Sequence, residues 1–194
     1  MSEKTGKQQR WNQRYQDVAF SEKSSAYVLS CNQHLLKNKG TALDLACGLG
    51  ANALFLAKKG YKVTAIDYAE AALTKLSDYA GDYGLSIETQ CEDLEAIKLK
   101  DSFYDVVVVS YYLQRDLVSE IFKSLKPGGV LFYQTFSGDC IDGNGPENPA
   151  YRLQQGELIS LCSEHSILYY REDSSCCIGQ DCFNGEAMIV VKRE

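Results

Sequence analysis

The chain has 194 residues, of which 45% are hydrophobic and 24% are charged. This length and composition predict one globular domain spanning residues 1–194 and exclude a fibrous or disordered chain. The net charge of -6, with lysine and arginine scattered along the chain, argues against nucleic acid as a partner, because phosphate binding needs clustered basic residues.

The first ten residues are polar, and no apolar run approaches the length of a membrane span. We therefore expect a cytoplasmic protein with no membrane partner. The eight cysteines are expected to be thiols, because the hydrophobic pattern already supplies a core and no export signal leads to an oxidising compartment.

Two helices are predicted before the first strand, over residues 8–15 and roughly 21–37. Together they form an N-terminal helical cap of residues 1–38. The α/β core of residues 39–194 follows.

Strands and helices alternate in the first half of this core, and each predicted helix ends at a glycine. The predicted strands cover residues 42–45, 62–66 and 86–90, and the predicted helices between them cover residues 52–58 and 70–83. This is a βαβαβ unit.

The strongest strand pattern is the β-branched run at residues 105–109, which is typical of a central strand buried on both faces of a parallel sheet. Beyond it lies a long loop at residues 137–150, rich in glycine and proline and of a length that is often functional. The other elements predicted here are a helix at 117–125, a turn at 126–129, a strand at 130–134, a helix at 155–162 and strands at 167–171 and 187–191.

Alternating strands and helices predict a doubly wound α/β fold, because right-handed crossovers place helices on both faces of the sheet. We predict seven strands, mainly parallel. The last two strands are joined by a non-helical loop, which predicts an antiparallel last strand.

The first strand-to-helix turn holds Gly48 and Gly50, in the context that a glycine loop for a nucleotide requires. With Ala53 the spacing also satisfies the dinucleotide fingerprint, so the glycines alone do not choose a cofactor. Asp44 favours a cation at this turn, because a carboxylate repels a pyrophosphate and attracts an ammonium or sulfonium group. A nicotinamide oxidoreductase would also need a Tyr-x-x-x-Lys motif or an equivalent, which the chain lacks.

Two further acids end strands on the same side of the predicted sheet. Asp67 follows the second strand, where a carboxylate can accept hydrogen bonds from ribose hydroxyls, and Asp93 follows the third, where it and the next backbone amide can meet an adenine edge. Structural alternatives exist for all three acids: Asp44 and Asp67 can cap the segments that follow them, and Asp93 can lie in a solvated loop.

These motifs resemble those of the class I S-adenosylmethionine-dependent methyltransferases. Residues 44–50 are similar to the first motif of that family, residues 65–67 to its second, residues 92–94 to its adenine-side acid, and residues 125–129 to the turn before strand five. The resemblance runs from about Trp11 to the end of the chain. It implies a Rossmann-like methyltransferase fold and S-adenosylmethionine as the cofactor.

Residues 11–15 are similar to the W-x-x-R-Y helix that precedes the core in methyltransferases of the tellurite-resistance type. The resemblance implies that this helix is a lid and that Arg14 meets the cofactor carboxylate, whereas a docking helix packed by Trp11 and Tyr15 is the structural alternative. The implied cofactor-binding residues are Arg14, Asp44, Ala46, Cys47, Gly48, Gly50, Asn52, Asp67, Tyr68, Asp93, Leu94 and Ser110.

Tyr111 follows the fourth strand, where it can act on the methyl acceptor or form a wall of the methyl channel. Arg152 lies in a segment that resembles the acceptor loops of the same subgroup and can hold an anionic acceptor. Both are candidate catalytic residues. Because no general base is evident, the sequence favours a small-molecule acceptor with a soft thiol or chalcogen nucleophile, which needs little help to ionise.

Two alternatives remain open: a protein methyltransferase, and a catalytically silent cofactor-binding partner subunit. We expect a monomer or a homodimer. No metal is predicted, because Cys140, Cys176, Cys177 and Cys182 lack the paired spacing of a zinc site.

Overall fold

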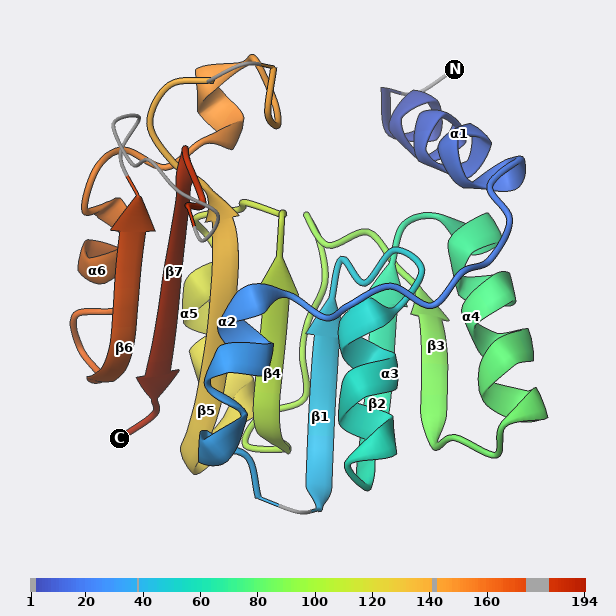
Figure 1. The fold of residues 1–194 in the computed structure, drawn as a ribbon, viewed down its shortest axis with the longest axis horizontal. Coiled ribbons are helices and arrows are strands. Elements are labelled where there is room, and N and C mark those ends of the chain that lie inside the picture. The colour runs from blue at the N-terminus through green and yellow to red at the C-terminus, as the bar shows by residue number, and fades with distance from the viewer. Residues whose placement is uncertain (1–2, 38, 141–142, 174–181) are drawn as a thin grey trace.

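The computed structural model describes residues 3–37, 39–140, 143–173 and 182–194, and these form a seven-stranded sheet with the strand order β3-β2-β1-β4-β5-β7-β6. Figure 1 shows this sheet with helices packed on it. The strands are β1 Gly40–Leu45, β2 Tyr61–Asp67, β3 Ile87–Cys91, β4 Tyr104–Ser110, β5 Leu125–Phe136, β6 Ser166–Asp173 and β7 Glu186–Lys192.

Strands β1 to β5 are paired in parallel, whereas β7 runs antiparallel to both of its neighbours, β5 and β6. This confirms the predicted doubly wound, mainly parallel sheet with an antiparallel last strand. The β-branched run at residues 106–109 belongs to β4, the middle strand of the seven, as predicted.

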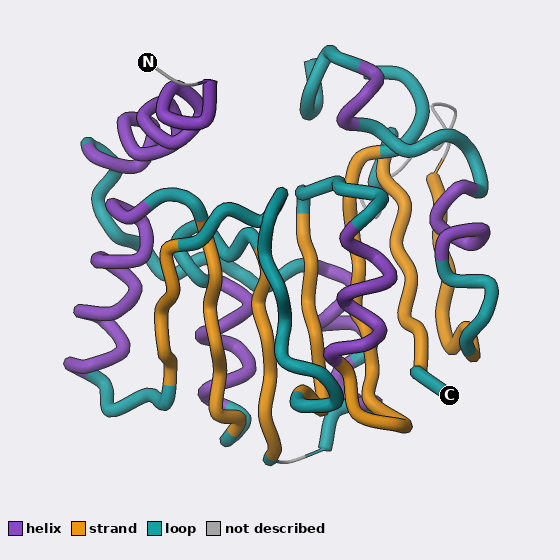
Figure 2. Tube along the Cα trace, turned by 180° about the vertical axis from the view of Figure 1, so that it is seen from behind, coloured by secondary structure: helices purple, strands orange, loops and turns teal. Residues whose placement is uncertain are grey.

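Helices cover both faces of the sheet, as the two opposite views in Figure 1 and Figure 2 show. One face carries α2, α3 and α4, and the other carries α5 and α6. The helices are α1 Glu3–Gln16, α2 Tyr27–Cys31, α3 Ala51–Lys58, α4 Glu70–Asp82, α5 Leu117–Ser124 and α6 Glu157–Leu161, with 3-10 turns η1 Gln33–Leu35 and η2 Pro149–Tyr151.

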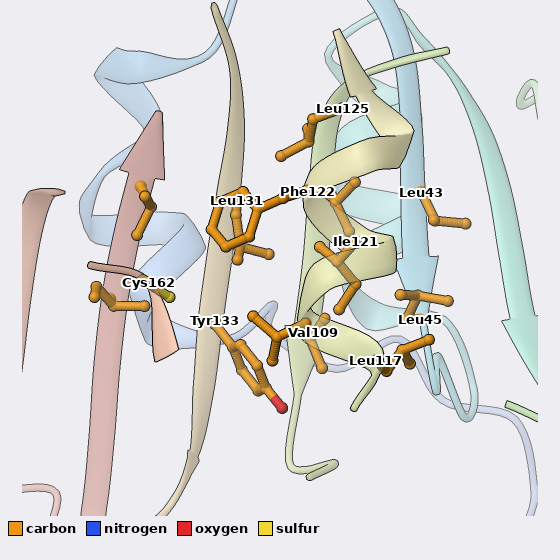
Figure 3. Close-up of a cluster of buried hydrophobic side chains, with 14 of the residues drawn as sticks. Leu43, Leu45, Val109, Leu117, Ile121, Phe122, Leu125, Leu131, Tyr133 and Cys162 are labelled. Atoms are coloured by element: carbon orange, nitrogen blue, oxygen red, sulfur yellow. The ribbon is translucent and has the colours of Figure 1, made fainter. Parts of the chain in front are cut away.

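Alternation along the buried strands divides the core into two layers. On β5, Leu131 and Tyr133 belong to the layer that holds α5, while Phe132 between them belongs to the layer of α2 and α3 on the opposite face. Figure 3 shows the first layer, in which Ile121 and Phe122 of α5 lie against the sheet. Because both faces of the central strands are covered, only the strand ends remain available for a site.

Two segments distant in the sequence lie at the end of the sheet to which the parallel strands point. Figure 1 shows α1 above α4 at one side of this end and the loop that holds η2 at the other side. Contacts between α1 and the first turn of α4 fix the first of these, since the Ala71 amide donates to Asn12 Oδ1 at 3.1 Å. The carboxyl ends of β1, β2, β3 and β4 therefore lie between two separate pieces of chain.

The predicted helix over residues 21–37 is wrong in its length. The described chain is non-helical from Val18 to Ala26, and helix begins only at Tyr27. Polar residues such as Ser24 and Ser25 hydrogen-bond readily outside helices. The Ala26 amide donates to the Asn52 side chain at 2.8 Å, which ties the end of this segment to α3.

The prediction of a turn at residues 126–129 before the strand is also wrong, because these residues already belong to β5, which begins at Leu125. The register between β4 and β5 shifts between Tyr104 and Val106, so the glycines form an irregular start of the strand. Gly128 has a φ of 74° and its amide donates to Arg193, which pairs this segment with the end of the chain.

We expect Phe132→Ala to lower the free energy of unfolding by about 3–5 kcal/mol, because it removes a fully buried ring and leaves a cavity in the central strand pair. The matched control is Leu168→Ala on β6, where a side chain that is 44% exposed should cost less than about 1 kcal/mol. Urea denaturation followed by circular dichroism measures both. Equal losses for the two variants would contradict the placement of the core.

Candidate functional site

The turn between β1 and α3 is built around two glycines in the left-handed conformation. Gly50, with a φ of 78°, directly precedes α3, and a Cβ there would lie 2.4 Å from the Leu76 side chain. Gly48 has a φ of 51°, and a Cβ there would lie 2.9 Å from Tyr15 Oη. Neither position accepts a side chain unless its neighbours shift, so glycine at both residues allows Tyr15 and Leu76 to pack closely on this turn.

Asp44 lies beneath this turn and has no exposed surface. Its Oδ2 accepts from the Ala53 amide at 2.9 Å and its Oδ1 accepts from Asn52 Nδ2 at 3.4 Å, so the carboxylate fixes the first turn of α3. Burial raises the pKa of Asp44 to about 7, against the lowering effect of those two hydrogen bonds. The capping role that we gave as the structural alternative is therefore present.

Asn52 connects three elements at the carboxyl end of the sheet. Its Nδ2 donates to Ser110 Oγ at 2.9 Å at the end of β4, and its Oδ1 accepts from the Ala26 amide. Asn52 and Ser110, both expected near the cofactor, are therefore in direct contact and tie β4 to α3.

Asp67, at the end of β2, accepts from the Gly48 amide at 2.7 Å and from the Ala69 amide at 2.8 Å. It thus holds the glycine turn and also caps the segment before α4. Burial raises the pKa of Asp67, which these amides partly oppose. The Tyr68 amide also hydrogen-bonds to Asp67, and because an ionised carboxylate has about four acceptor positions, capacity remains for a further donor.

The other expected residues on this side lie close to Asp67. The Tyr68 carbonyl accepts from Cys91 Sγ at 3.7 Å, at the end of β3. Asp93 accepts from the Glu95 amide at 3.0 Å in the turn after β3, and the Leu94 side chain is buried in the core. Ala46 has a φ of 54°, Cys47 is buried, and the Cys47 amide donates to Ile66 on β2.

Helix α1 is docked against this edge by its last turns. Lys75 of α4 donates to the carbonyls of Tyr15, Gln16 and Val18 at 2.6–2.9 Å and so closes the carboxyl end of α1. Tyr15 is half-buried over the glycine turn, whereas Arg14 is exposed, with its guanidinium 5.1 Å from the centre of the Trp11 ring. The exposed Arg14 guanidinium is therefore adjacent in sequence to Tyr15, whose hydroxyl contacts the glycine turn.

Tyr111 follows β4 in a left-handed conformation with a φ of 55°, which is uncommon for a bulky residue and marks a constrained position. Its side chain is 49% exposed. Its Oη accepts from Gln134 Nε2 at 3.0 Å and donates to Glu186 Oε2 at 3.3 Å. The hydroxyl of Tyr111 is thus fixed by Gln134 and Glu186, while about half of the residue remains exposed.

Arg152 does not stand free for an anionic acceptor, which corrects the role expected for it. Its side chain is 3% exposed, and its guanidinium donates to backbone carbonyls of the long loop and of the segment before β7. These carbonyls belong to Ser137, Gly138, Asp139, Asn144, Pro146 and Gly185. Because each donor is already paired, Arg152 fixes the loop beside Tyr111.

Three residues in these contacts were missed in the sequence. Gln134 and Glu186 are buried polar residues in strands, and Lys75 lies on the outer part of α4. A glutamine that follows an apolar run within β5 is an unusual strand residue and was the available signal. The sequence offered no comparable signal for Glu186 or Lys75.

Among the residues that the structure describes, no group of three or more histidine, cysteine or acidic side chains could hold a metal ion. Cys140 is a free thiol, whereas Cys182 is disulfide-bonded, so the expectation that all cysteines are thiols is wrong there. Cys176 and Cys177 lie outside the described residues. Within the described part of the chain, no helix is long and apolar enough to cross a membrane.

Comparison with known proteins gives one family match. Residues 42–129 match the model of a methyltransferase domain. The span includes the glycine turn and Asp67, and it ends at the start of β5.

The chain is also similar to curated proteins, one of which is named as a methyltransferase. The chain is 35% identical over 138 residues to the probable S-adenosyl-L-methionine-dependent methyltransferase TehB of Haemophilus influenzae, covering 68% of this chain and 48% of that protein. It is 38% identical over 137 residues to Hemagglutinin 1 of Eikenella corrodens, covering 67% of this chain and 45% of that protein. The chain thus spans about half the length of these relatives.

The crystal structure of TehB from Haemophilus influenzae superposes with a TM-score of 0.70 at 20% identity, covering 97% of this chain and 67% of that chain. At this identity the superposition establishes the fold. The chain has the Rossmann-like fold of the class I methyltransferases.

We expect Asp44→Asn to remove a pH dependence of stability. The pKa of Asp44 is 3.8 ordinarily and about 7 in the folded protein, so the folded state binds its proton more tightly than the unfolded state. Wild-type stability therefore falls as pH rises from about 4 through about 7, by up to about 1.4 kcal/mol per pH unit. The variant should lose this fall, so that its stability relative to wild type increases between pH 5 and pH 8.

Denaturation at several pH values measures this, with Asp105→Asn as the control. Burial raises the pKa of Asp105 but is outweighed by hydrogen bonds from Lys126 and Thr41, which leave it below its ordinary value. Stability from Asp105 is lost only as pH falls below that ordinary value, so its variant should stay parallel to wild type between pH 5 and pH 8. Parallel behaviour of Asp44→Asn would show that Asp44 is ionised throughout.

Proposed function

We propose that this chain, which resembles the class I S-adenosylmethionine-dependent methyltransferases of the TehB type, transfers a methyl group from S-adenosylmethionine to a small-molecule acceptor. The methyltransferase-domain match and the relative named as S-adenosyl-L-methionine-dependent imply this cofactor. The observation that carries the proposal is Asp67, which holds the Gly48 amide while keeping acceptor capacity for a ribose.

The residues at the glycine turn fit this cofactor. A Cβ at Gly48 or Gly50 would collide with Tyr15 or Leu76, so both glycines are required for the turn to pack against α1 and α4. Asp44 and Asp67 place two carboxylates at the turn, which suits a cationic ligand better than a pyrophosphate. Arg14 lies on the lid helix, where an exposed guanidinium can pair with a carboxylate.

When bound, the cofactor supplies a methyl group on a positive sulfur, whose departure needs no proton. The chain then has to hold the acceptor in line with that methyl and exclude water, and alignment of this kind accounts for much of the rate in such displacements. Tyr111 stands at the end of β4, next to Ser110, and is fixed by Gln134 and Glu186. We assign it to the acceptor side of the site.

A small acceptor with a thiol or chalcogen nucleophile is the first class to test, because such groups ionise near neutral pH. Two rival proposals remain. A protein methyltransferase would methylate a polypeptide, and a catalytically silent cofactor-binding partner subunit would methylate no acceptor. We retain a single domain of residues 1–194, a cytoplasmic location and a monomer or homodimer as parts of the proposal.

We expect the wild-type protein to bind S-adenosylmethionine in a calorimetric titration and to give no binding heat with NADH. Asp67→Ala should weaken the binding by roughly 10- to 100-fold, since hydrogen bonds to a charged group contribute about 1.5–3 kcal/mol. Asp105→Ala is the matched control, because Asp105 also accepts a backbone amide, at 2.8 Å from Thr41, but at the opposite end of the sheet. Binding of NADH, or equal affinities of the two variants, would sink the cofactor assignment.

We also expect Arg14→Gln to weaken S-adenosylhomocysteine by about 10-fold while leaving 5′-methylthioadenosine unchanged, because only the first ligand carries a carboxylate. Arg10→Gln, one turn earlier on α1, should affect neither ligand. The same calorimetric measurement applies. An equal loss for both ligands would mean that Arg14 acts by docking the lid helix.

A further inference from the structure

Glu186 is a buried carboxylate beneath the acceptor side of the site. It begins β7, is 7% exposed, and pairs in register with Phe136 of β5 and Asp173 of β6. Its Oε2 accepts from Gln134 Nε2 at 2.7 Å and from Tyr111 Oη at 3.3 Å. A buried carboxylate is costly unless it is hydrogen-bonded, and here both partners belong to the one polar cluster.

Gln134 determines the direction of the hydrogen bonds in this cluster. It has no exposed surface, and its Oε1 accepts from the Val28 amide at 3.0 Å, which fixes the amide orientation. Its Nε2 therefore donates to Tyr111 Oη at 3.0 Å, so the phenol proton is directed to Glu186. A hydroxyl oxygen has two acceptor positions, and Gln134 uses one. The second is left for an incoming donor.

The charges around Glu186 suit a proton acceptor. Burial raises the pKa of Glu186, while Gln134, Tyr111, Asn144 and the positive charge of Arg152 oppose that shift. Asp173, across the strand pair, is paired with Arg171 at 2.6 Å. Arg152 is immobilised by backbone carbonyls, so its charge is a fixed feature of the surroundings of Glu186.

Aromatic packing fixes the Tyr111 ring from the side. The centres of the Phe136 and Tyr111 rings are 5.2 Å apart. The Arg152 guanidinium in turn lies 5.3 Å from the centre of the Phe136 ring. Together with the left-handed backbone at Tyr111, this leaves the hydroxyl little freedom to leave Glu186. The pair is preorganised, which is what a proton relay requires.

We propose that the Tyr111 hydroxyl and the Glu186 carboxylate form a relay that removes the acceptor's proton, so that the acceptors of this chain include hydroxyl groups, which keep their proton at neutral pH. The proposal rests on the proposed methyl transfer. Tyr111 touches the acceptor, and Glu186 is a positioning residue that acts through Tyr111.

The step balances in atoms and charge. The acceptor oxygen forms a bond to the methyl carbon as the carbon–sulfur bond breaks and its electron pair stays on sulfur. The acceptor proton passes to Tyr111 Oη, and the Tyr111 proton passes to Glu186 Oε2. Glu186 becomes a neutral acid, and it returns the proton to water after the product leaves.

Glu186→Gln tests the relay without removing its architecture. A glutamine oxygen can accept from both Gln134 and Tyr111, so the hydrogen bonds persist while the basic group is lost. The probes are catechol, whose hydroxyls are protonated at neutral pH, and 5-thio-2-nitrobenzoate, which is already a thiolate. We expect the variant to lose roughly 100-fold in kcat for catechol, the scale of general-base catalysis, and to keep thiolate turnover within about twofold.

The pH profile provides a second readout. Wild-type kcat/KM for catechol should rise with pH as Glu186 ionises, and this rise should be absent in Glu186→Gln. Tyr111→Phe should lose a similar amount, and the double variant should lose no more than either single variant, because the two groups act as one unit.

Glu172→Gln is the matched control. Glu172 lies on the neighbouring strand β6 and accepts from Tyr170 Oη at 2.5 Å. It therefore forms the same kind of tyrosine–carboxylate pair, but without Tyr111. It should retain catechol turnover.

The outcomes separate this inference from the proposed function. Equal losses on both probes would reduce Glu186 to a structural role, and wild-type turnover of the thiolate alone would overturn the hydroxyl inference while leaving methyl transfer in place. A protein that binds S-adenosylmethionine but methylates neither probe also overturns the relay. Failure to bind S-adenosylmethionine would instead remove the proposed function.

Discussion

The buried carboxylate of Asp44 is the constraint on which the rest of the site depends. It has no contact with water, so its hydrogen bonds must come from the protein, and they come from Ala53 and Asn52 at the start of α3. Asn52 then uses its remaining groups on Ser110 and Ala26. One buried carboxyl group thereby joins β1, β4, α3 and the segment before α2, and each of these would have to shift if its hydrogen bonds were broken.

The central strands β1 and β4 are each followed by a non-glycine residue with a positive φ, Ala46 at 54° and Tyr111 at 55°. Such residues cost free energy and persist where the surrounding structure holds them. Asp44 and Asn52 hold the first of these turns, and Gln134 with Glu186 holds the second. The strained backbone at each of these turns is therefore supported by a buried polar cluster.

Most of the fold follows from local pattern, since apolar runs with glycine ends predict the strands and helices of residues 40–136 to within a few residues. The extended segment before Tyr27 did not follow, because its conformation depends on the distant Asn52. The site divides in the same way. Asp44, Gly48, Gly50 and Asp67 are neighbours in sequence motifs, whereas Tyr111 and Glu186 are 75 positions apart and meet only because β7 inserts beside β5. Arg152 shows the reverse error, since a cation in a predicted acceptor loop proved to be fully used by the backbone.

Burial raises the pKa of three carboxylates in this site, Asp44, Asp67 and Glu186, so the protein holds their negative charges at a cost. For Asp44 and Asp67 the cost includes their mutual repulsion. A cation bound at the glycine turn would reduce both the cost of burial and the repulsion between the two acids, because it supplies an opposite charge. By linkage, the same ligand would stabilise the fold in proportion to its binding. Under the proposed function, a positively charged cofactor would therefore offset part of the electrostatic cost of burying the acids that also cap these helices.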